Sequence, residues 1–250
     1  MNKLNAIYVS LLSLVVALGT LVYCIIGCCN KKEAAAPAAT LDAESVKAVL
    51  LEQPEMLFEA LQKGEEKRHE EMRLASQKLI EENIDEINNY AASPVLGNKD
   101  GKITVVEFFD FACGYCHRLS PVLMNIIKKN DDVRLVLKPV YFLSPASAYG
   151  AKALYAADKQ GLAKEFYVAI MENKGQLSEA VIDEVATKVG MDIEKMKATM
   201  ASEDVSKAMA DTAELAQKVQ VTGVPTLVIE GEKVQTLSES DIQNKINAAK

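Results

Sequence analysis

Apolar residues are distributed in three different ways along the 250-residue chain. Residues 6–27 contain no charged side chain, residues 41–92 place apolar side chains at three- and four-residue steps, and two later runs are apolar at nearly every position. An uncharged run of this length could span a bilayer, steps of three and four predict helices, and continuous short runs indicate strands buried on both faces. The pattern therefore predicts a membrane-directed segment, a helical region and an α/β domain.

The α/β domain is expected over residues 93–250. Strands are predicted at residues 103–109 and 133–142, and the later run GVPTLVIEGEKVQTL is typical of a hairpin that turns near Gly231. Residues from about 146 to 220 are helical in pattern almost throughout, and a last helix begins at Ser238. This order of elements predicts an α/β fold with an all-helical insertion.

The helical region at residues 41–92 carries a narrow apolar stripe between many charged residues. The stripe comprises Met72, Leu79, Ile80, Ile84 and Ile87. So narrow a stripe suits a coiled-coil-like seam, and we expect a homo-oligomer, most simply a dimer. The alternative is that the same helix packs on its own domain. Residues 30–40, which include the run EAAAPAAT, are expected to be a tether.

The N-terminal segment, residues 1–29, has three interpretations that all place the rest of the chain outside the cytoplasm. The end of the apolar run, IIGC, resembles the bacterial lipobox, with Gly27 before an acylated Cys28. The alternatives are an uncleaved membrane anchor and a cleaved signal peptide. The expected location is the bacterial cell envelope, periplasmic or surface side, with an anchor formed by lipid on Cys28 or by the apolar segment.

Charge and composition narrow the classes of partner. The formal net charge is −7, and no basic stripe follows any predicted element. An acidic protein of this kind offers no surface for nucleic-acid phosphates, so nucleic-acid binding is not expected.

Cysteine usage points to chemistry rather than to structural crosslinks. Of five cysteines, three lie in the N-terminal segment, which leaves Cys113 and Cys116 in the exported part. A disulfide between them would close a very small loop and would remove little chain entropy. In an oxidising compartment, a lone close pair is better explained as a reactive one.

The motif CGYCH, which contains this pair, is compatible with haem attachment, zinc binding or thiol–disulfide exchange. Zinc sites usually need four ligands, and the chain has two histidines, His69 and His117. A haem motif would be expected in a small helical domain, whereas this one lies between a strand and a helix. We therefore favour redox chemistry, with neither metal nor cofactor.

The predicted position of the motif assigns different roles to the two thiols. A cysteine at a helix start lies where free N–H groups and the helix dipole favour a thiolate, so Cys113 is expected to attack disulfides. Cys116, one turn further on, would resolve the mixed disulfide. His117 could lie near the Cys113 sulfur and stabilise the thiolate; the alternative is an exposed histidine without a role.

Two stretches carry a family resemblance. VVEFFDFACGYCHRLSP and GVPTLVIEG resemble the thioredoxin superfamily, specifically exported bacterial disulfide oxidoreductases of the DsbA type. KPVYFLSPASAYGAKALYAADKQG resembles the segment that leads into their helical insert, and the likeness covers about residues 94–249. The N-terminal helical region resembles the oligomerising segments of ScsC-like relatives. The resemblance implies a thioredoxin fold with an all-helical insertion, preceded by an oligomerisation region.

The resemblance implies roles for several residues. Cys113 and Cys116 match the nucleophile and the resolving cysteine. Val224–Pro225 matches a pair whose proline is cis and lies against the active disulfide, where the missing N–H leaves the preceding backbone free to pair with substrate. The alternative is an ordinary turn proline.

Glu107 matches a buried acid that exchanges a proton with the resolving thiol, and Lys138 on the next strand is expected to be its partner. The alternative for both is a strand-end charge that reaches solvent. Gly114 and Tyr115 lie between the cysteines, where strongly oxidising relatives carry Pro-His, so the oxidising power is open.

The expected function is an exported thiol–disulfide oxidoreductase that forms disulfides in unfolded or reduced exported proteins and is recharged by a DsbB-type membrane partner. An alternative in the same class is an oligomeric disulfide isomerase or reductase. An alternative of another class is a surface lipoprotein with a stalk that serves binding.

Overall fold

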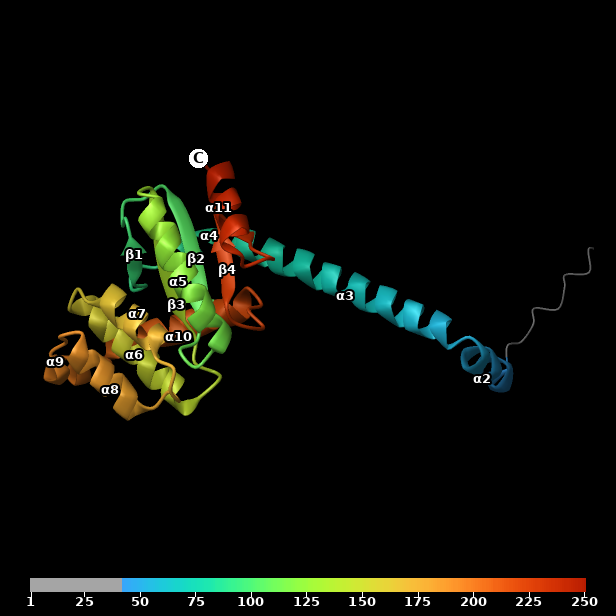
Figure 1. Ribbon diagram of the computed structural model, residues 1–250, viewed down its shortest axis with the longest axis horizontal. Helices are drawn as coiled ribbons and strands as arrows, with labels where there is room; N and C mark the ends of the chain where they lie inside the picture. The colour runs from blue at the N-terminus through green and yellow to red at the C-terminus, as the bar shows by residue number, and fades with distance from the viewer. Residues whose placement is uncertain (1–41) are drawn as a thin grey trace, which may run out of the picture. The chain divides into compact units, whose positions relative to one another are not determined.

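The computed structural model describes residues 42–250 (Figure 1). The predicted N-terminal segment, the lipidation site Cys28 and the tether lie outside the described residues. The chain divides into two compact units between Glu65 and Glu66. From residue 42 onward, none of the helices has both the length and the hydropathy that a bilayer crossing requires.

The second unit is built on a five-stranded mixed sheet with the strand order β1-β3-β2-β4-β5. β2 and β3 are parallel, and all other neighbours are antiparallel. The strands are β1 (Val95–Gly97), β2 (Ile103–Phe109), β3 (Val133–Pro139), β4 (Thr226–Ile229) and β5 (Glu232–Lys233). Every residue of β2 is buried, which agrees with the continuous apolar run that predicted a central strand.

The hairpin between β4 and β5 turns through Glu230 and Gly231, which have φ angles of 47° and 81°. A two-residue hairpin loop of the favoured type needs positive φ at both positions, and glycine adopts it without steric penalty. The turn predicted near Gly231 is therefore present.

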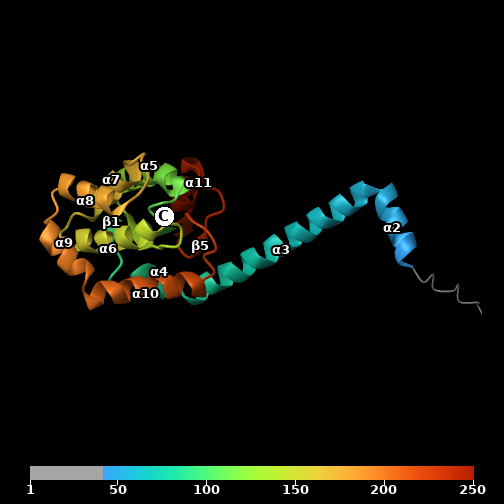
Figure 2. The same cartoon turned by 90° about the horizontal axis from the view of Figure 1, so that it is seen from below.

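Helices cover both faces of the sheet. They are α4 (Ile84–Asn89), α5 (Gly114–Lys129), α6 (Pro145–Lys159), α7 (Ala163–Glu172), α8 (Glu179–Lys188), α9 (Ile193–Met200), α10 (Glu203–Lys218) and α11 (Glu239–Ala248). α5, α7 and α11 contribute side chains to the core on one face, and α4 and α10 to the core on the other. Figure 2 shows these two sets on opposite sides of the domain. α6 to α10 form the predicted all-helical insertion.

The N-terminal helices correct one prediction. They are α2 (Ala43–Glu52) and α3 (Pro54–Glu82), followed by α4. Ile80 and Ile87 are fully buried against Val106, Phe108 and Val136 of the sheet. The expectation that the whole stripe forms a seam between chains is therefore wrong for these two residues. An amphipathic stripe needs an apolar partner, and here the chain's own sheet supplies it.

Candidate active site

The strand–loop–helix junction places Cys113 at the start of α5, where it is the N-cap residue. Its backbone N–H donates to the carbonyl oxygen of Asp110 at 2.9 Å, which closes the loop between β2 and the helix. Its side chain retains 7% exposure, whereas Cys116 is fully buried one turn further on. Both are free thiols. Of the two thiols, Cys113 is therefore the one with a surface open to solvent.

The Val224–Pro225 segment lies directly against the first thiol. The Cys113 Sγ donates to the carbonyl oxygen of Val224 at 3.4 Å, although 111 residues separate the two in sequence. The Val224–Pro225 peptide bond is cis, as the sequence led us to expect. This pair precedes β4, so the sheet fixes the backbone next to the sulfur.

Glu107 is a fully buried acid on β2. The Tyr167 hydroxyl on α7 donates to its Oε2 at 2.8 Å, while Oε1 has no hydrogen-bond partner among the described residues. Burial raises the pKa of Glu107 to about 8, and the hydrogen bond from Tyr167 acts in the opposite direction. The carboxyl group is therefore mainly protonated at neutral pH.

Cys116 is held in the neutral form by its surroundings. Burial raises the pKa of this thiol far above its ordinary value, and the nearby Glu107 carboxylate raises it further. A backbone hydrogen bond from Asp110 acts the other way but is the weaker effect. Because only a thiolate attacks a disulfide, Cys116 needs a neighbour that accepts its proton. We predict that Glu107 is that neighbour, through the fraction of it that is ionised at neutral pH.

Lys138 does not pair with Glu107, so that prediction is wrong. Glu107 is aligned with Leu137 in the parallel ladder, and Lys138 is aligned with Phe108. Since alternate residues of a strand point to opposite faces, the two charged side chains lie on opposite sides of the sheet. The Lys138 ammonium donates to the carbonyl oxygen of Glu86 at 3.2 Å and lies 5.0 Å from the Tyr90 ring centroid.

The His117 ring forms its hydrogen bond with the backbone and not with either thiol. Its Nε2 donates to the carbonyl oxygen of Phe111 at 2.7 Å, which ties α5 to the preceding loop. A direct effect of His117 on the Cys113 sulfur therefore stays a prediction. Gly114 is exposed, and Tyr115 is 69% exposed with the Arg118 guanidinium 4.1 Å from its ring centroid.

Two residues of the site were missed by the sequence analysis. Asp110 is a fully buried carboxylate that accepts hydrogen bonds from the Ala112 N–H at 2.8 Å, the Leu143 N–H at 3.1 Å and the Ser147 hydroxyl at 2.6 Å. It joins the loop before Cys113 to the start of the helical insertion. An acid inside the run FFDFAC is the signal that could have found it.

Tyr167 is the second missed residue. It lies 60 positions after Glu107, in a helix whose apolar pattern is typical of an ordinary core helix. The sequence contains no signal for this contact. Within residues 42–250, no cluster of three or more His, Cys, Asp or Glu side chains is arranged to hold a metal ion.

A mixed sheet, a C-x-x-C pair at a helix start and a cis-proline beside it define a thioredoxin-type fold with the thiol–disulfide oxidoreductase class of site. Residues 104–247 match the model of the DSBA-like thioredoxin domain. The chain belongs to this family, which confirms the predicted fold class and the recognised resemblance.

Comparison with individual proteins supports the same family assignment. The chain is 32% identical over 147 residues to the thiol:disulfide interchange protein DsbA of Pseudomonas aeruginosa, covering 56% of this chain and 69% of that one. A thioredoxin-like oxidoreductase from Silicibacter pomeroyi has 34% identity and a TM-score of 0.63, covering 66% of this chain and 96% of that one. A linker-deletion mutant of Proteus mirabilis ScsC has 25% identity and a TM-score of 0.66, covering 84% of this chain and 97% of that one.

The chain also resembles part of a larger protein. It is 26% identical over 141 residues to a Na⁺/H⁺ antiporter NhaA of Salinispora arenicola, covering 56% of this chain and 22% of the antiporter.

Proposed function

We propose that this protein is an exported thiol–disulfide oxidoreductase that forms disulfides in unfolded or reduced exported proteins. One observation carries the proposal: Cys113, the more exposed of the two thiols, lies at a helix start and contacts Val224 beside the cis-proline, while the fully buried Cys116 lies next to a buried acid. An accessible nucleophile and a shielded resolving thiol are the two parts that disulfide exchange requires.

In the oxidising direction, a substrate thiolate attacks Cys113 Sγ of the Cys113–Cys116 disulfide. A substrate–Cys113 disulfide forms, and Cys116 leaves as a thiolate that takes a proton from Glu107. A second substrate thiolate then attacks the substrate sulfur of the mixed disulfide and releases Cys113 as a thiolate. The substrate loses two electrons, and the protein pair gains them.

Separate cysteine variants test this assignment. We expect Cys113→Ser to abolish oxidation of a reduced, unfolded protein substrate, and Cys116→Ser to retain attack while it accumulates mixed disulfides on Cys113. The measurement is substrate folding together with mass mapping of trapped adducts and of alkylated sulfurs at mildly acidic pH. Preferential alkylation of Cys116 would overturn the roles, and an inactive parent protein would favour the binding-lipoprotein alternative.

The same proposal places the protein in the bacterial cell envelope, with a DsbB-type membrane partner that reoxidises the pair. The anchor would be lipid on Cys28 or the apolar segment itself. Radiolabelled palmitate and membrane fractionation of the parent and Cys28→Ser separate these cases. Loss of label with loss of membrane attachment indicates a lipoprotein, whereas retained attachment without label indicates an uncleaved anchor.

A second candidate, an oligomeric isomerase or reductase, rests on exposed apolar side chains in the first unit. Leu51 is 72% exposed and Phe58 is 71% exposed, and others are Leu50, Met56, Leu57 and Leu61. Exposed apolar side chains of this kind suit association between copies of the chain. The solution mass of the exported chain, with and without Leu51→Ser and Phe58→Ser, tests association. A reduction potential near about −270 mV rather than about −120 mV would favour the reductase.

A further inference from the structure

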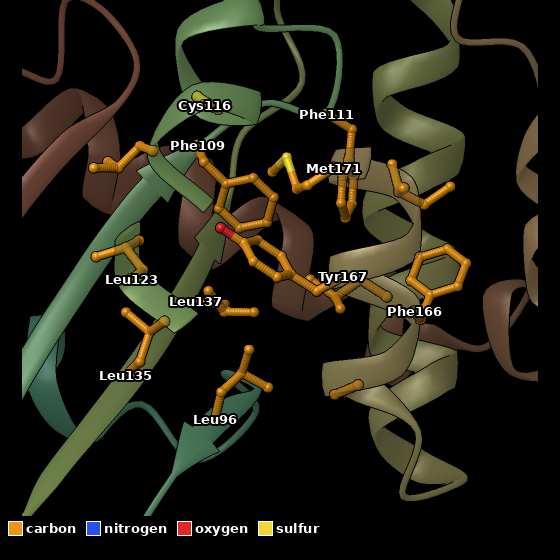
Figure 3. Packing of buried hydrophobic residues seen from close by; sticks show 14 of the residues in the cluster. Leu96, Phe109, Phe111, Cys116, Leu123, Leu135, Leu137, Phe166, Tyr167 and Met171 are labelled. Carbon is orange, nitrogen blue, oxygen red and sulfur yellow. The ribbon is translucent and has the colours of Figure 1, made fainter. Parts of the chain in front are cut away.

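Tyr167 is the neighbour that organises the Glu107 carboxyl group. Its hydroxyl donates to Glu107 Oε2 at 2.8 Å, and its ring packs edge-on against Phe109 with the centroids 5.3 Å apart. Figure 3 shows the ring reaching from α7 towards the sheet, below Phe109, with the hydroxyl oxygen pointing to the strands. The side chain is fully buried, so no water competes for the hydroxyl.

Glu107 has no cationic neighbour on its own face of the sheet among the described residues. The ladder partners on its two sides are Leu137 of β3 and Leu227 of β4, both apolar and buried. The titratable groups that face it are the Tyr167 phenol from α7 and the Cys116 thiol from α5. Its protonation therefore depends on burial, one hydroxyl and one thiol.

This arrangement distinguishes the two carboxyl oxygens. In the protonated acid one oxygen carries the proton and the other accepts hydrogen bonds. Because the Tyr167 hydroxyl already donates to Oε2, the proton belongs on Oε1, the oxygen without a partner. Oε1 is thus the oxygen available for exchange with Cys116.

We propose that Tyr167 is a positioning residue for proton transfer at Cys116, because its hydroxyl holds Oε2 of Glu107 and reserves Oε1 for the thiol. The inference rests on the proposed thiol–disulfide exchange and assigns its proton step to a tyrosine–glutamate pair. During resolution, the Cys116 proton passes to Oε1 of the ionised Glu107, the Cys116 thiolate attacks Cys113 Sγ, the Cys113–Cys116 bond forms, and the substrate leaves as a thiolate.

The test uses the full exported chain in the dithiol state and an aromatic disulfide reagent, dithionitrobenzoate. In a stopped-flow experiment, the first phase reports attack by Cys113 and release of one aryl thiolate. The second phase reports proton loss from Cys116, its attack on Cys113 Sγ and release of the second aryl thiolate. The variant is Tyr167→Phe, which removes one oxygen and keeps the ring packing.

Tyr155→Phe is the matched control. Tyr155 is equally a buried tyrosine of the helical insertion, but its hydroxyl lies 3.0 Å from the Thr212 hydroxyl in a different core cluster. We expect Tyr167→Phe to leave the first phase unchanged and to slow the second phase about tenfold at pH 7. Its inflection should move to higher pH, because the hydrogen bond that the variant loses lowers the pKa of Glu107 in the parent. Tyr155→Phe should match the parent in both phases.

The outcomes separate this inference from the proposed function. Superimposed second-phase profiles for the parent and Tyr167→Phe would overturn the positioning role, even where the parent oxidises protein substrates. A shifted profile in a protein without activity on protein substrates would support the tyrosine–glutamate pair and remove the proposed function instead. Carbon-13 NMR titration of Glu107 gives an independent measure: its pKa should rise in Tyr167→Phe and stay the same in Tyr155→Phe.

Discussion

Two buried ionisable side chains on neighbouring strands lie on opposite faces of the sheet and contact different groups. Glu107 faces the redox pair and Tyr167, whereas Lys138 faces the Glu86 carbonyl and the Tyr90 ring on the other side of the sheet. Burial raises the pKa of the acid to about 8 and lowers that of the lysine to about 8, so each is pushed towards its neutral form. Desolvation alone therefore does not mark a functional group; the neighbour does.

The lysine face is an attachment surface for the N-terminal part of the second unit. Ile87 of α4 is buried there, and the Lys218 ammonium of α10 lies 3.2 Å from the Glu86 carboxylate. The Tyr90 hydroxyl donates to Asp211 on the same helix. These contacts hold residues 84–90 on the sheet and include no atom of the thiol pair. The comparison therefore assigns chemistry to one face and docking to the other.

The largest expected effect is on the rate of attack by Cys116, which should depend on Glu107 on one face of the sheet and not on Lys138 on the other. Glu107→Gln should slow attack by Cys116 about a hundredfold at neutral pH, because the amide cannot accept its proton. Lys138→Met, which removes the other buried charge, should leave both phases of the stopped-flow reaction unchanged. Equal slowing in the two variants would mean that the faces are coupled and that the comparison fails.

The pH dependence of unfolding separates the same groups by stability. Folded Glu107 keeps its proton to about pH 8 while an ordinary glutamate loses it near 4.5, so stability falls as pH rises between these values. Folded Lys138 loses its proton near 8 instead of 10.5, so its contribution to stability rises as pH rises between those values. Each shift corresponds to several kcal/mol.

Urea unfolding of the reduced proteins across this pH range tests the signs. The free energy of unfolding of Glu107→Gln minus that of the parent should increase from pH 4.5 to 8, because only the parent loses stability there. The free energy of unfolding of Lys138→Met minus that of the parent should decrease from pH 8 to 10.5, because only the parent gains stability there. Differences that stay constant with pH would show that burial does not shift these groups. Burial keeps the Cys116 thiol protonated from pH 4.5 to 8, so it does not contribute to the Glu107→Gln difference in that range.

The sequence predicted the elements of the site better than their pairing. Cys113, Cys116 and Pro225 are recognisable because their spacing and flanking runs are local. The faces of Glu107 and Lys138 depend on the register of two strands that are about 30 residues apart, and a shift of one residue reverses a side chain. A pattern of apolar residues in each strand does not contain that register.

The contacts of the helical region were unpredictable for a related reason. The stripe that includes Ile80 and Ile87 predicts that one helix face is buried, but it does not identify the partner. The central strands were expected to be buried on both faces. The chain's own helices cover the face that Ile80 and Ile87 contact. Tyr167 was invisible because a tyrosine among core residues carries no local sign of its hydroxyl partner.

Shortening a buried side chain of α4 on the face that Lys138 occupies should reduce stability without changing the rates of thiol–disulfide exchange. Ile87→Ala removes a fully buried side chain and should lower the free energy of unfolding by about 3 kcal/mol, while the rates of both thiol phases stay unchanged. Met72→Ala on α3, at an exposed position, should change stability by less than about 0.5 kcal/mol. A fall in the second-phase rate of Ile87→Ala would show that docking supports the redox face.

A smaller effect than that of Ile87→Ala is expected at Tyr90, the tyrosine whose ring contacts the Lys138 ammonium. Tyr90→Phe keeps the ring that lies 5.0 Å from the ammonium but removes the hydroxyl that donates to Asp211. Asp211 retains its ion pair with Lys207 at 2.7 Å, so the carboxylate is not left without a partner and the loss should be about 1 kcal/mol. Tyr90→Leu removes the ring as well and should lower the pKa of Lys138 further, since a favourable contact of the charged form is lost. Urea unfolding of both variants at pH 7 and pH 9 measures these effects. Equal losses in Tyr90→Phe and Tyr90→Leu would show that the hydroxyl, rather than the ring, holds this face together.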